Sequence, residues 1–175
     1  MPFQLGVVVI DLEEDAVAID VEGPKVVLFI RVIGLGELVE YACSQRAAHE
    51  GVADGKQWFA LWPEMDGRPE DLYVVKRCYS AFVPGSSDLE SVLRHNKIDA
   101  VLIAGTATSV CCESTARDAM MLDFKCIMVS DGLAACEQEE HQKSLEGFML
   151  YFGGVLTADQ TIERLKRDKS VTRPR

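Results

Sequence analysis

The stretch VLIAGTATSVCCESTARD, residues 101–118, determines how this chain is organised. It is preceded by Ala100, and the apolar run over residues 100–104 is long enough for one buried strand. Gly105 interrupts that strand, and a turn of small and hydroxylated residues follows. Residues 112–122 then have the apolar spacing of an amphipathic helix. The pattern therefore predicts that Cys111 lies where a strand ends and a helix begins.

This position gives Cys111 two possible roles. Ligand crevices of parallel α/β sheets lie at the carboxyl ends of strands, and the first amides of a helix favour an anion such as a thiolate. The backbone N–H groups of the turn are also suited to hold an oxyanion. We expect Thr108 or Ser109 to cap the helix. A cysteine here can be a nucleophile, or simply a small buried apolar side chain.

The rest of the chain alternates between strand and helix patterns. Further strands are predicted over residues 6–12, 25–32, 72–76, 125–129 and 155–156. Asp131 and Gly132 are expected to end the strand over residues 125–129. Helices are predicted over residues 36–50, 87–96, 137–152 and 157–167, the last with a capping box at Thr157 and Gln160. The alternation predicts an α/β fold: a three-layer αβα, Rossmann-like arrangement with a mostly parallel sheet. Residues 1–167 form one domain, and residues 168–175 are expected to be a frayed tail.

Composition narrows the class of protein. The chain has 175 residues, is 48% hydrophobic, and carries a net charge of −10, which argues against a nucleic-acid partner. We expect no membrane association, because no apolar run approaches the roughly 20 residues that span a bilayer. The N-terminus has no signal-peptide pattern, so a cytoplasmic protein is expected. Its six cysteines and three histidines form no ligand pattern, and we predict reduced thiols, no metal and no cofactor.

The sequence GTATSVCCESTARDAMMLDFKCIMVSDGLAA, residues 105–135, resembles the signature of the isochorismatase-like cysteine hydrolases. In that family a G-x-x-T-[DN]-x-C turn carries the nucleophile, and S-T-A-x-D-A follows on the helix. Ser109 stands where the family usually has Asp or Asn. The form with Cys112 is most similar to the ureidoacrylate amidohydrolase and N-carbamoylsarcosine amidase branches. The resemblance extends over residues 72–165 and is patchy before them.

The resemblance implies a triad of Asp11, Lys76 and Cys111. VVIDLEED, residues 8–15, matches the family's first strand V-I-D-M-Q-N-D-F at Asp11, the general base, but departs at Glu13, Glu14 and Ala16. KRCYSAF, residues 76–82, matches K-R-x-Y-S-A-F, in which the lysine completes the triad. From composition alone Asp11 is a turn-capping residue, and Lys76 is a strand-end lysine that reaches water. The implied activity is hydrolysis of a C–N bond in a small amide, ureido or carbamoyl compound through a thioester.

The same resemblance implies further site residues. The backbone N–H groups of Ala107 and Cys111 would form the oxyanion hole, next to a non-proline cis peptide between Thr106 and Ala107. Substrate contacts are expected from Tyr79, Phe82, Trp58 and Thr106, with core or edge packing as the alternative for the three aromatic residues. Cys112 is expected to be packed in the interior.

Only residues 13–24 separate the first two predicted strands, although a parallel crossover needs a dozen or more residues and usually a helix. We therefore expect the first crossover helix to be shortened or missing, and the helix over residues 36–50 to replace it. An uncovered sheet face would favour a homo-oligomer. The shortened segment after Asp11 also leaves open an alternative function: a catalytically impaired family member that acts as a binding or assembly module.

A third reading is a cysteine phosphatase, because Cys111 and Arg117 fit the spacing C-x5-R. A phosphate loop typically uses glycine to expose many N–H groups to the anion, and CCESTAR has none. Glu113, Asp118 and the acidic net charge would also repel phosphate. The sequence disfavours this reading.

Overall fold

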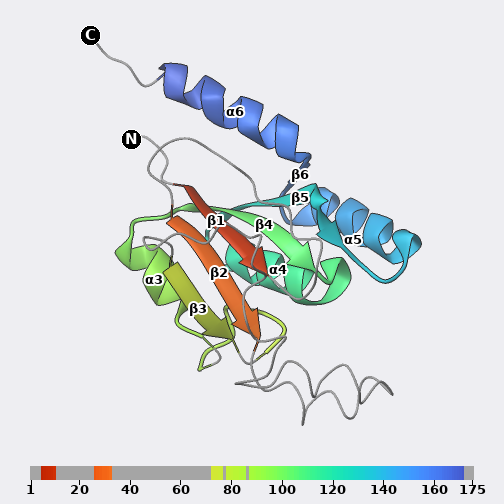
Figure 1. The fold of residues 1–175 in the computed structure, drawn as a ribbon, viewed down its shortest axis with the longest axis horizontal. Coiled ribbons are helices and arrows are strands. Elements are labelled where there is room, and N and C mark those ends of the chain that lie inside the picture. The colour runs from red at the N-terminus through yellow and green to blue at the C-terminus, as the bar shows by residue number, and fades with distance from the viewer. Residues whose placement is uncertain (1–4, 11–25, 33–71, 77, 86, 172–175) are drawn as a thin grey trace.

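The computed structural model describes residues 5–10, 26–32, 72–76, 78–85 and 87–171 (Figure 1). Six strands form one sheet in the order β3-β2-β1-β4-β5-β6, and every neighbouring pair is parallel. The strands are β1 (Leu5–Ile10), β2 (Val26–Val32), β3 (Leu72–Lys76), β4 (Ala100–Thr106), β5 (Lys125–Ala134) and β6 (Gly154–Leu156). Their apolar composition is typical of strands that are covered by helices on a parallel sheet.

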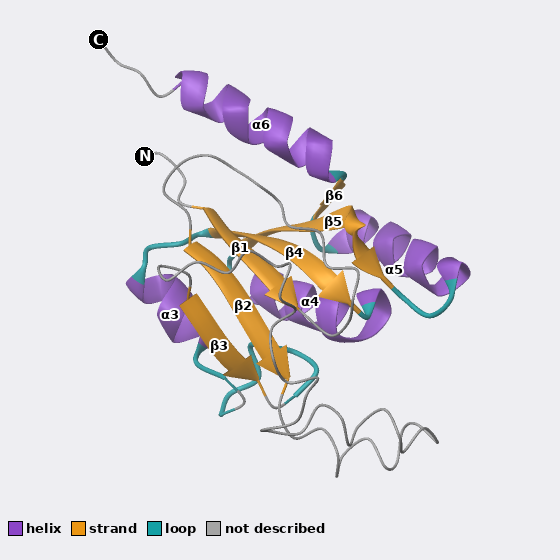
Figure 2. Cartoon of the chain, in the orientation of Figure 1, coloured by secondary structure: helices purple, strands orange, loops and turns teal. Residues whose placement is uncertain are grey.

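The described helices lie between successive strands of the chain or after the last one, as is usual when parallel strands are connected. They are α3 (Leu89–His95), the π-helix η2 (Thr108–Cys112), α4 (Glu113–Met121), α5 (Gln138–Tyr151) and α6 (Ala158–Val171). Figure 2 shows α4 behind the strands and α6 projecting beyond β6 at the end of the sheet. Helices and parallel sheet together form an open αβα arrangement, which confirms the predicted fold class.

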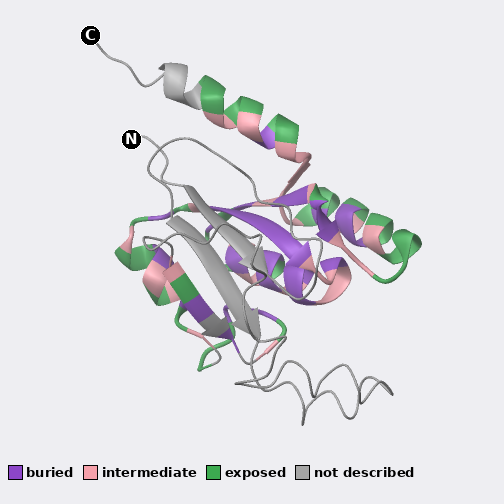
Figure 3. Cartoon of the chain, viewed as in Figure 1, coloured by how far each residue is buried: buried purple, intermediate pink, exposed green. Residues whose placement is uncertain are grey.

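The core lies between the sheet and the helices behind it, with β4 at its centre (Figure 3). Residues 101–104 of β4 are almost completely buried. Each neighbouring helix contributes side chains with no exposed surface: Leu89 and Leu93 from α3, Ala116 and Ala119 from α4, and Phe148 from α5. The parallel register brings the carboxyl ends of the strands to one edge, with Ile10 paired to Gly105 and Val32 to Lys76.

The structure extends three elements by two or more residues beyond the predicted bounds. β4 runs through Gly105, which was expected to interrupt it, to Thr106. β5 continues past Asp131 to Ala134 through a register shift against β4. A Cβ atom at Gly132 would lie 3.4 Å from that of Ala104. Asp131 instead accepts a hydrogen bond from the N–H of Ala158, 2.7 Å, at the start of α6. α6 runs to Val171, so residues 168–171 of the expected tail are helical.

The predicted capping box at the start of α6 is confirmed. The N–H of Thr157 donates to Gln160 Oε1, 3.1 Å, and the N–H of Gln160 donates to Thr157 Oγ1, 3.2 Å. Two other predictions, the shortened first crossover and the helix over residues 36–50, lie outside the described residues.

Gly153 is required where α5 turns back to β6. A Cβ atom at this position would lie 2.5 Å from the carbonyl oxygen of Cys126 and 2.8 Å from the Phe148 ring. Because one of these atoms is backbone, we expect Gly153→Ala to lower the free energy of unfolding by about 3 kcal/mol. Urea titration measures this, and Gly147→Ala, where nothing lies within 4 Å of the added Cβ, is the matched control. Equal stability of the two variants would contradict the packing described here.

Candidate active site

Lys76 is the last residue of β3 and its side chain is completely buried. Its ammonium donates to the carbonyl oxygens of Cys78, at 3.0 Å, and Tyr79, at 2.9 Å. It also interacts with the side chain of Cys111, electrostatically and through a hydrogen bond. Burial lowers the pKa of Lys76 from its ordinary value of 10.5, and Cys111 partly offsets this by favouring the ammonium. The lysine is therefore directed inward toward a sulfur and does not reach water.

Cys111 lies in η2, directly after β4, and is 3% exposed. The turn begins at Ala107, whose carbonyl accepts hydrogen bonds from the N–H groups of Val110 and Cys112, each 3.2 Å. The predicted cis peptide between Thr106 and Ala107 is present. A strand end, a cis peptide and a short π-helix thus hold the sulfur beside Lys76, which comes from a strand three positions away in the sheet.

Thr115 joins the two halves of this arrangement. Its hydroxyl donates to the carbonyl oxygen of Cys111, 2.7 Å, and accepts from the N–H of Ala81, 3.2 Å. The loop that holds the Lys76 ammonium is therefore tied to the helix that carries Cys111. Thr115 was not predicted as a site residue, although its spacing of four residues from Cys111 is the signal for this bond within a helix.

The predicted cap at η2 is wrong. Neither Ala107 nor Cys112, the residues that precede η2 and α4, makes a side-chain capping hydrogen bond. The hydroxyl of Thr108 instead shares a hydrogen bond with His141 Nδ1, 2.8 Å, and that of Ser109 donates to Glu140 Oε1, 2.5 Å. Both partners belong to α5, which no local pattern in residues 105–122 predicts.

The predicted substrate contacts fall in different environments. Tyr79 is 36% exposed, whereas Phe82 is 7% exposed and packs against Phe124 with ring centroids 5.6 Å apart. Phe82 therefore occupies the core, the alternative that the sequence left open. The hydroxyl of Thr106 is buried and has no hydrogen-bond partner within the described residues. Asp11 and Trp58 lie outside the described residues.

Burial keeps two other thiols of the described residues neutral, Cys112 beside Cys111 and Cys126 on β5. Burial raises the pKa of Cys112 well above its ordinary value of 9.0, and the adjacent Cys111 raises it further. Cys112 has no exposed surface, as predicted. Burial also raises the pKa of Cys126 to about 12. The five cysteines in the described part of the chain form no disulfide with one another.

Cys126 makes folding sensitive to alkaline pH. Its thiol ionises near pH 9 in the unfolded chain but near 12 in the folded one, so the folded state holds an extra proton between these values. Stability is therefore lost as pH rises above 9. We expect Cys126 to account for a loss of about 2 kcal/mol between pH 8 and 10.5.

Urea unfolding of wild type and Cys126→Val under reducing conditions measures this loss, because the other titrating groups cancel in the difference. Met128→Leu, a buried substitution on the same strand that does not titrate, is the control. A difference between wild type and Cys126→Val that stays constant with pH would refute the assignment.

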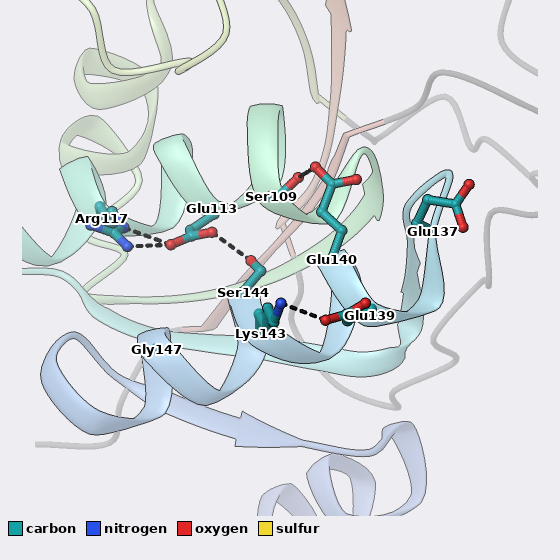
Figure 4. A pocket seen from close by; sticks show the side chains of 9 residues that line it. All are labelled: Ser109, Glu113, Arg117, Glu137, Glu139, Glu140, Lys143, Ser144 and Gly147. Carbon is teal, nitrogen blue, oxygen red and sulfur yellow. Dashed lines mark hydrogen bonds and ion pairs between the residues drawn. The ribbon is translucent and has the colours of Figure 1, made fainter.

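An open cleft lies between α4 and α5, beside Ser109 of η2 (Figure 4). It is lined by Ser109, Glu113, Arg117, Glu137, Glu139, Glu140, Lys143, Ser144 and Gly147. Neither Lys76, Cys111 nor Thr106 lines it. Within the described residues no group of three or more potential metal ligands occurs, and every helix is too short or too polar to serve as a membrane span.

The fold and this site define a class of protein: parallel α/β domains in which a thiol at a strand–helix junction meets a buried lysine from another strand. A family model described as the isochorismatase domain matches residues 18–160. The chain belongs to the isochorismatase family, which confirms the resemblance found in the sequence.

Individual relatives agree with this assignment. The uncharacterised isochorismatase family protein YwoC of Bacillus subtilis is 32% identical over 62% of this chain and 57% of its own length. The ureidoacrylate amidohydrolase RutB of Variovorax paradoxus is 36% identical over 63% of this chain and 44% of its own length. The chain thus spans about half the length of the curated relatives it matches.

Solved structures share the fold over most of the chain. An isochorismatase-like hydrolase from Alkaliphilus metalliredigens has a TM-score of 0.76 and 26% identity, covering 93% of this chain and 98% of that one. N-carbamoylsarcosine amidase from Thermoplasma acidophilum has a TM-score of 0.70 and 18% identity, covering 90% and 98%. Because the sequence identity to N-carbamoylsarcosine amidase is only 18%, this similarity concerns the fold alone.

Proposed function

We propose that this protein is a cysteine-dependent hydrolase that cleaves a C–N bond of a small amide, ureido or carbamoyl compound. The observation that carries the proposal is the buried contact between Lys76 and Cys111 at the carboxyl edge of the sheet. Burying a lysine ammonium away from water costs free energy unless the charge is paired. Stabilisation of the Cys111 thiolate would provide such a pairing and a functional reason for the buried lysine. Family membership supports the same chemistry.

In the proposed reaction Asp11 takes the proton of the Cys111 thiol, and the thiolate attacks the carbonyl carbon of the substrate. The N–H groups of Ala107 and Cys111 hold the oxyanion. Asp11 returns the proton to the departing nitrogen, so ammonia or an amine leaves as the C–N bond breaks. Water then attacks the thioester, Asp11 accepts a proton from it, and the thiol of Cys111 is restored with release of the acid. No cofactor takes part.

The role of Asp11 rests on the strand order. β1 ends at Ile10, which pairs with Gly105 on β4, and Asp11 follows directly in the chain. The carboxyl ends of β1 and β4 are therefore neighbours at the edge where Cys111 follows β4. This is the edge at which parallel α/β sheets bind ligands.

The proposed substrate contacts are Thr106, Tyr79 and Trp58. The buried Thr106 hydroxyl is available to hydrogen-bond a polar substrate group, because no described residue partners it. Phe82 is omitted from the contacts, since its ring is packed against Phe124. We further propose a cytoplasmic homo-oligomer that acts on a free small molecule, with neither nucleic acid nor membrane as partner.

The proposal is tested by assaying ammonia release from a panel of ureido, carbamoyl and carboxamide compounds. The panel includes ureidoacrylate and N-carbamoylsarcosine, after the names of the relatives. Turnover of at least one compound, lost after alkylation of Cys111 with iodoacetamide, is the expected result. Absence of turnover together with an unreactive Cys111 would instead favour the binding or assembly module.

A further inference from the structure

The first two turns of α5 present three polar side chains to η2, which carries Cys111, and to α4, which follows it. Ser144 lies three positions after His141 and four after Glu140 in α5. Residues at these spacings are neighbours on the surface of a helix, so the three side chains lie on one side of it. Figure 4 shows two of the resulting contacts, Ser109 with Glu140 and Ser144 with Glu113. The third joins His141 to Thr108.

These contacts differ in how much the turn depends on them. Ser109 and Glu140 meet at the exposed surface, where water can replace either partner. Thr108 has no exposed surface, and the imidazole of His141 is the partner of its hydroxyl at 2.8 Å. Removing the imidazole would take away the partner that the hydrogen-bond geometry gives to this hydroxyl, on a residue with no exposed surface, and we expect the turn to move in response.

Thr108 lies between the two groups that the proposed reaction needs in place, the N–H of Ala107 and the sulfur of Cys111. Its N-terminal neighbour is Ala107, which follows the cis peptide, and Cys111 lies three residues later in the same π-helix. A shift of the Thr108 backbone therefore moves both the Ala107 N–H and the Cys111 sulfur. Either movement weakens the contact between the sulfur and the Lys76 ammonium or misdirects the oxyanion donor.

We propose that His141 is a positioning residue, which acts through the Thr108 hydroxyl to hold Cys111 against Lys76. Its effect on catalysis rests on the proposed function, but its effect on the thiol does not. The contact needs a polar atom at the position of Nδ1. Asparagine supplies one there, whereas alanine does not, and glutamine places its amide farther out.

The test measures alkylation of Cys111 by iodoacetamide at pH 7, resolved by peptide mass spectrometry so that each cysteine is followed separately. His141→Ala and His141→Gln are expected to slow alkylation of Cys111 about tenfold, and His141→Asn to restore it to within about threefold of wild type. Gln142→Ala is the matched control: Gln142 is the next residue of α5, is exposed, and donates a hydrogen bond to Glu146 Oε1, 2.8 Å, on its own helix.

The buried thiols report on folding in the same experiment. If His141 only stabilised the fold, His141→Ala would accelerate alkylation of Cys112 and Cys126, and this outcome overturns the proposal. An unchanged Cys111 rate in His141→Ala also overturns it. A Thr108→Val background provides the mechanistic check, because there His141→Ala should have no further effect on Cys111. Additive effects of the two substitutions would show that His141 acts by another route.

Turnover separates this inference from the proposed function. With a compound that the wild type hydrolyses, His141→Ala should lower kcat about tenfold while KM changes less than about twofold. Loss of activity in Cys111→Ala together with an unaltered kcat in His141→Ala would contradict the positioning role of His141 but not the proposed function. Full activity of Cys111→Ala would contradict the proposed function, and the alkylation rates of Cys111 would still test the role of His141.

Discussion

Cys111→Ala is expected to lower kcat by at least about 10⁴-fold, because no covalent intermediate can form without the sulfur. The substitution removes only one atom from a site that is 3% exposed, so the fold should persist. Binding of the substrate should change little, since the proposed oxyanion donors are backbone N–H groups. Ammonia release with the best compound of the panel measures the effect, and circular dichroism verifies the fold.

Cys112→Ala is the matched control for this prediction. It makes the same change at the next residue, also buried, where the thiol is held neutral by burial and by its neighbour Cys111. We expect its kcat to stay within a few-fold of wild type, although a small cavity will lower stability. If Cys112→Ala were inactive and Cys111→Ala active, the nucleophile would have been assigned to the wrong cysteine.

Lys76→Met is expected to lower kcat/KM by about 10²–10³-fold. Methionine fills a similar volume but brings no charge, so the Cys111 thiolate loses its cationic neighbour. The carbonyl oxygens of Cys78 and Tyr79 also lose the donor that they share. The loop after β3 is expected to loosen, but removal of a buried charge offsets part of that cost.

Two measurements separate these effects of Lys76→Met. The iodoacetamide rate of Cys111 at pH 7 reports the lost charge, and urea unfolding reports the loosened loop. We expect the first to fall at least about tenfold and the second to shift only modestly. A variant that kept the wild-type kcat/KM would show that the buried ammonium does not serve the chemistry.

Local patterns in the sequence were enough to predict much of the fold. The apolar runs over residues 100–104 and 72–76 predicted β4 and β3, although β4 continues past Gly105 to Thr106. The reciprocal cap of Thr157 and Gln160 is present in the structure. The meeting of Lys76 with Cys111 was predicted through the family resemblance, because its motif joins residues 35 positions apart. Nothing in the strand-end position of Lys76 alone distinguished it from a lysine that reaches water.

Contacts between distant segments could not be predicted in the same way. Thr108 and Ser109 look like helix caps because hydroxyls before a helix usually bond its first amides. Here each finds its partner on α5, 33 and 31 residues later, and the turn closes as a π-helix instead. The extension of β5 was missed for a similar reason: Asp131 and Gly132 are typical turn residues, but β5 pairs with β4 again at Leu133 and Ala134.

The most direct test of the central claim is to look for the thioester itself. Wild-type protein is mixed with a hydrolysable compound, quenched with acid within the first turnover, and analysed by peptide mass spectrometry. The peptide that contains Cys111 should gain the mass of the acyl part of the substrate, with the nitrogen already lost. Release of ammonia while the Cys111 peptide remains unmodified at every time in the first turnover would contradict the account.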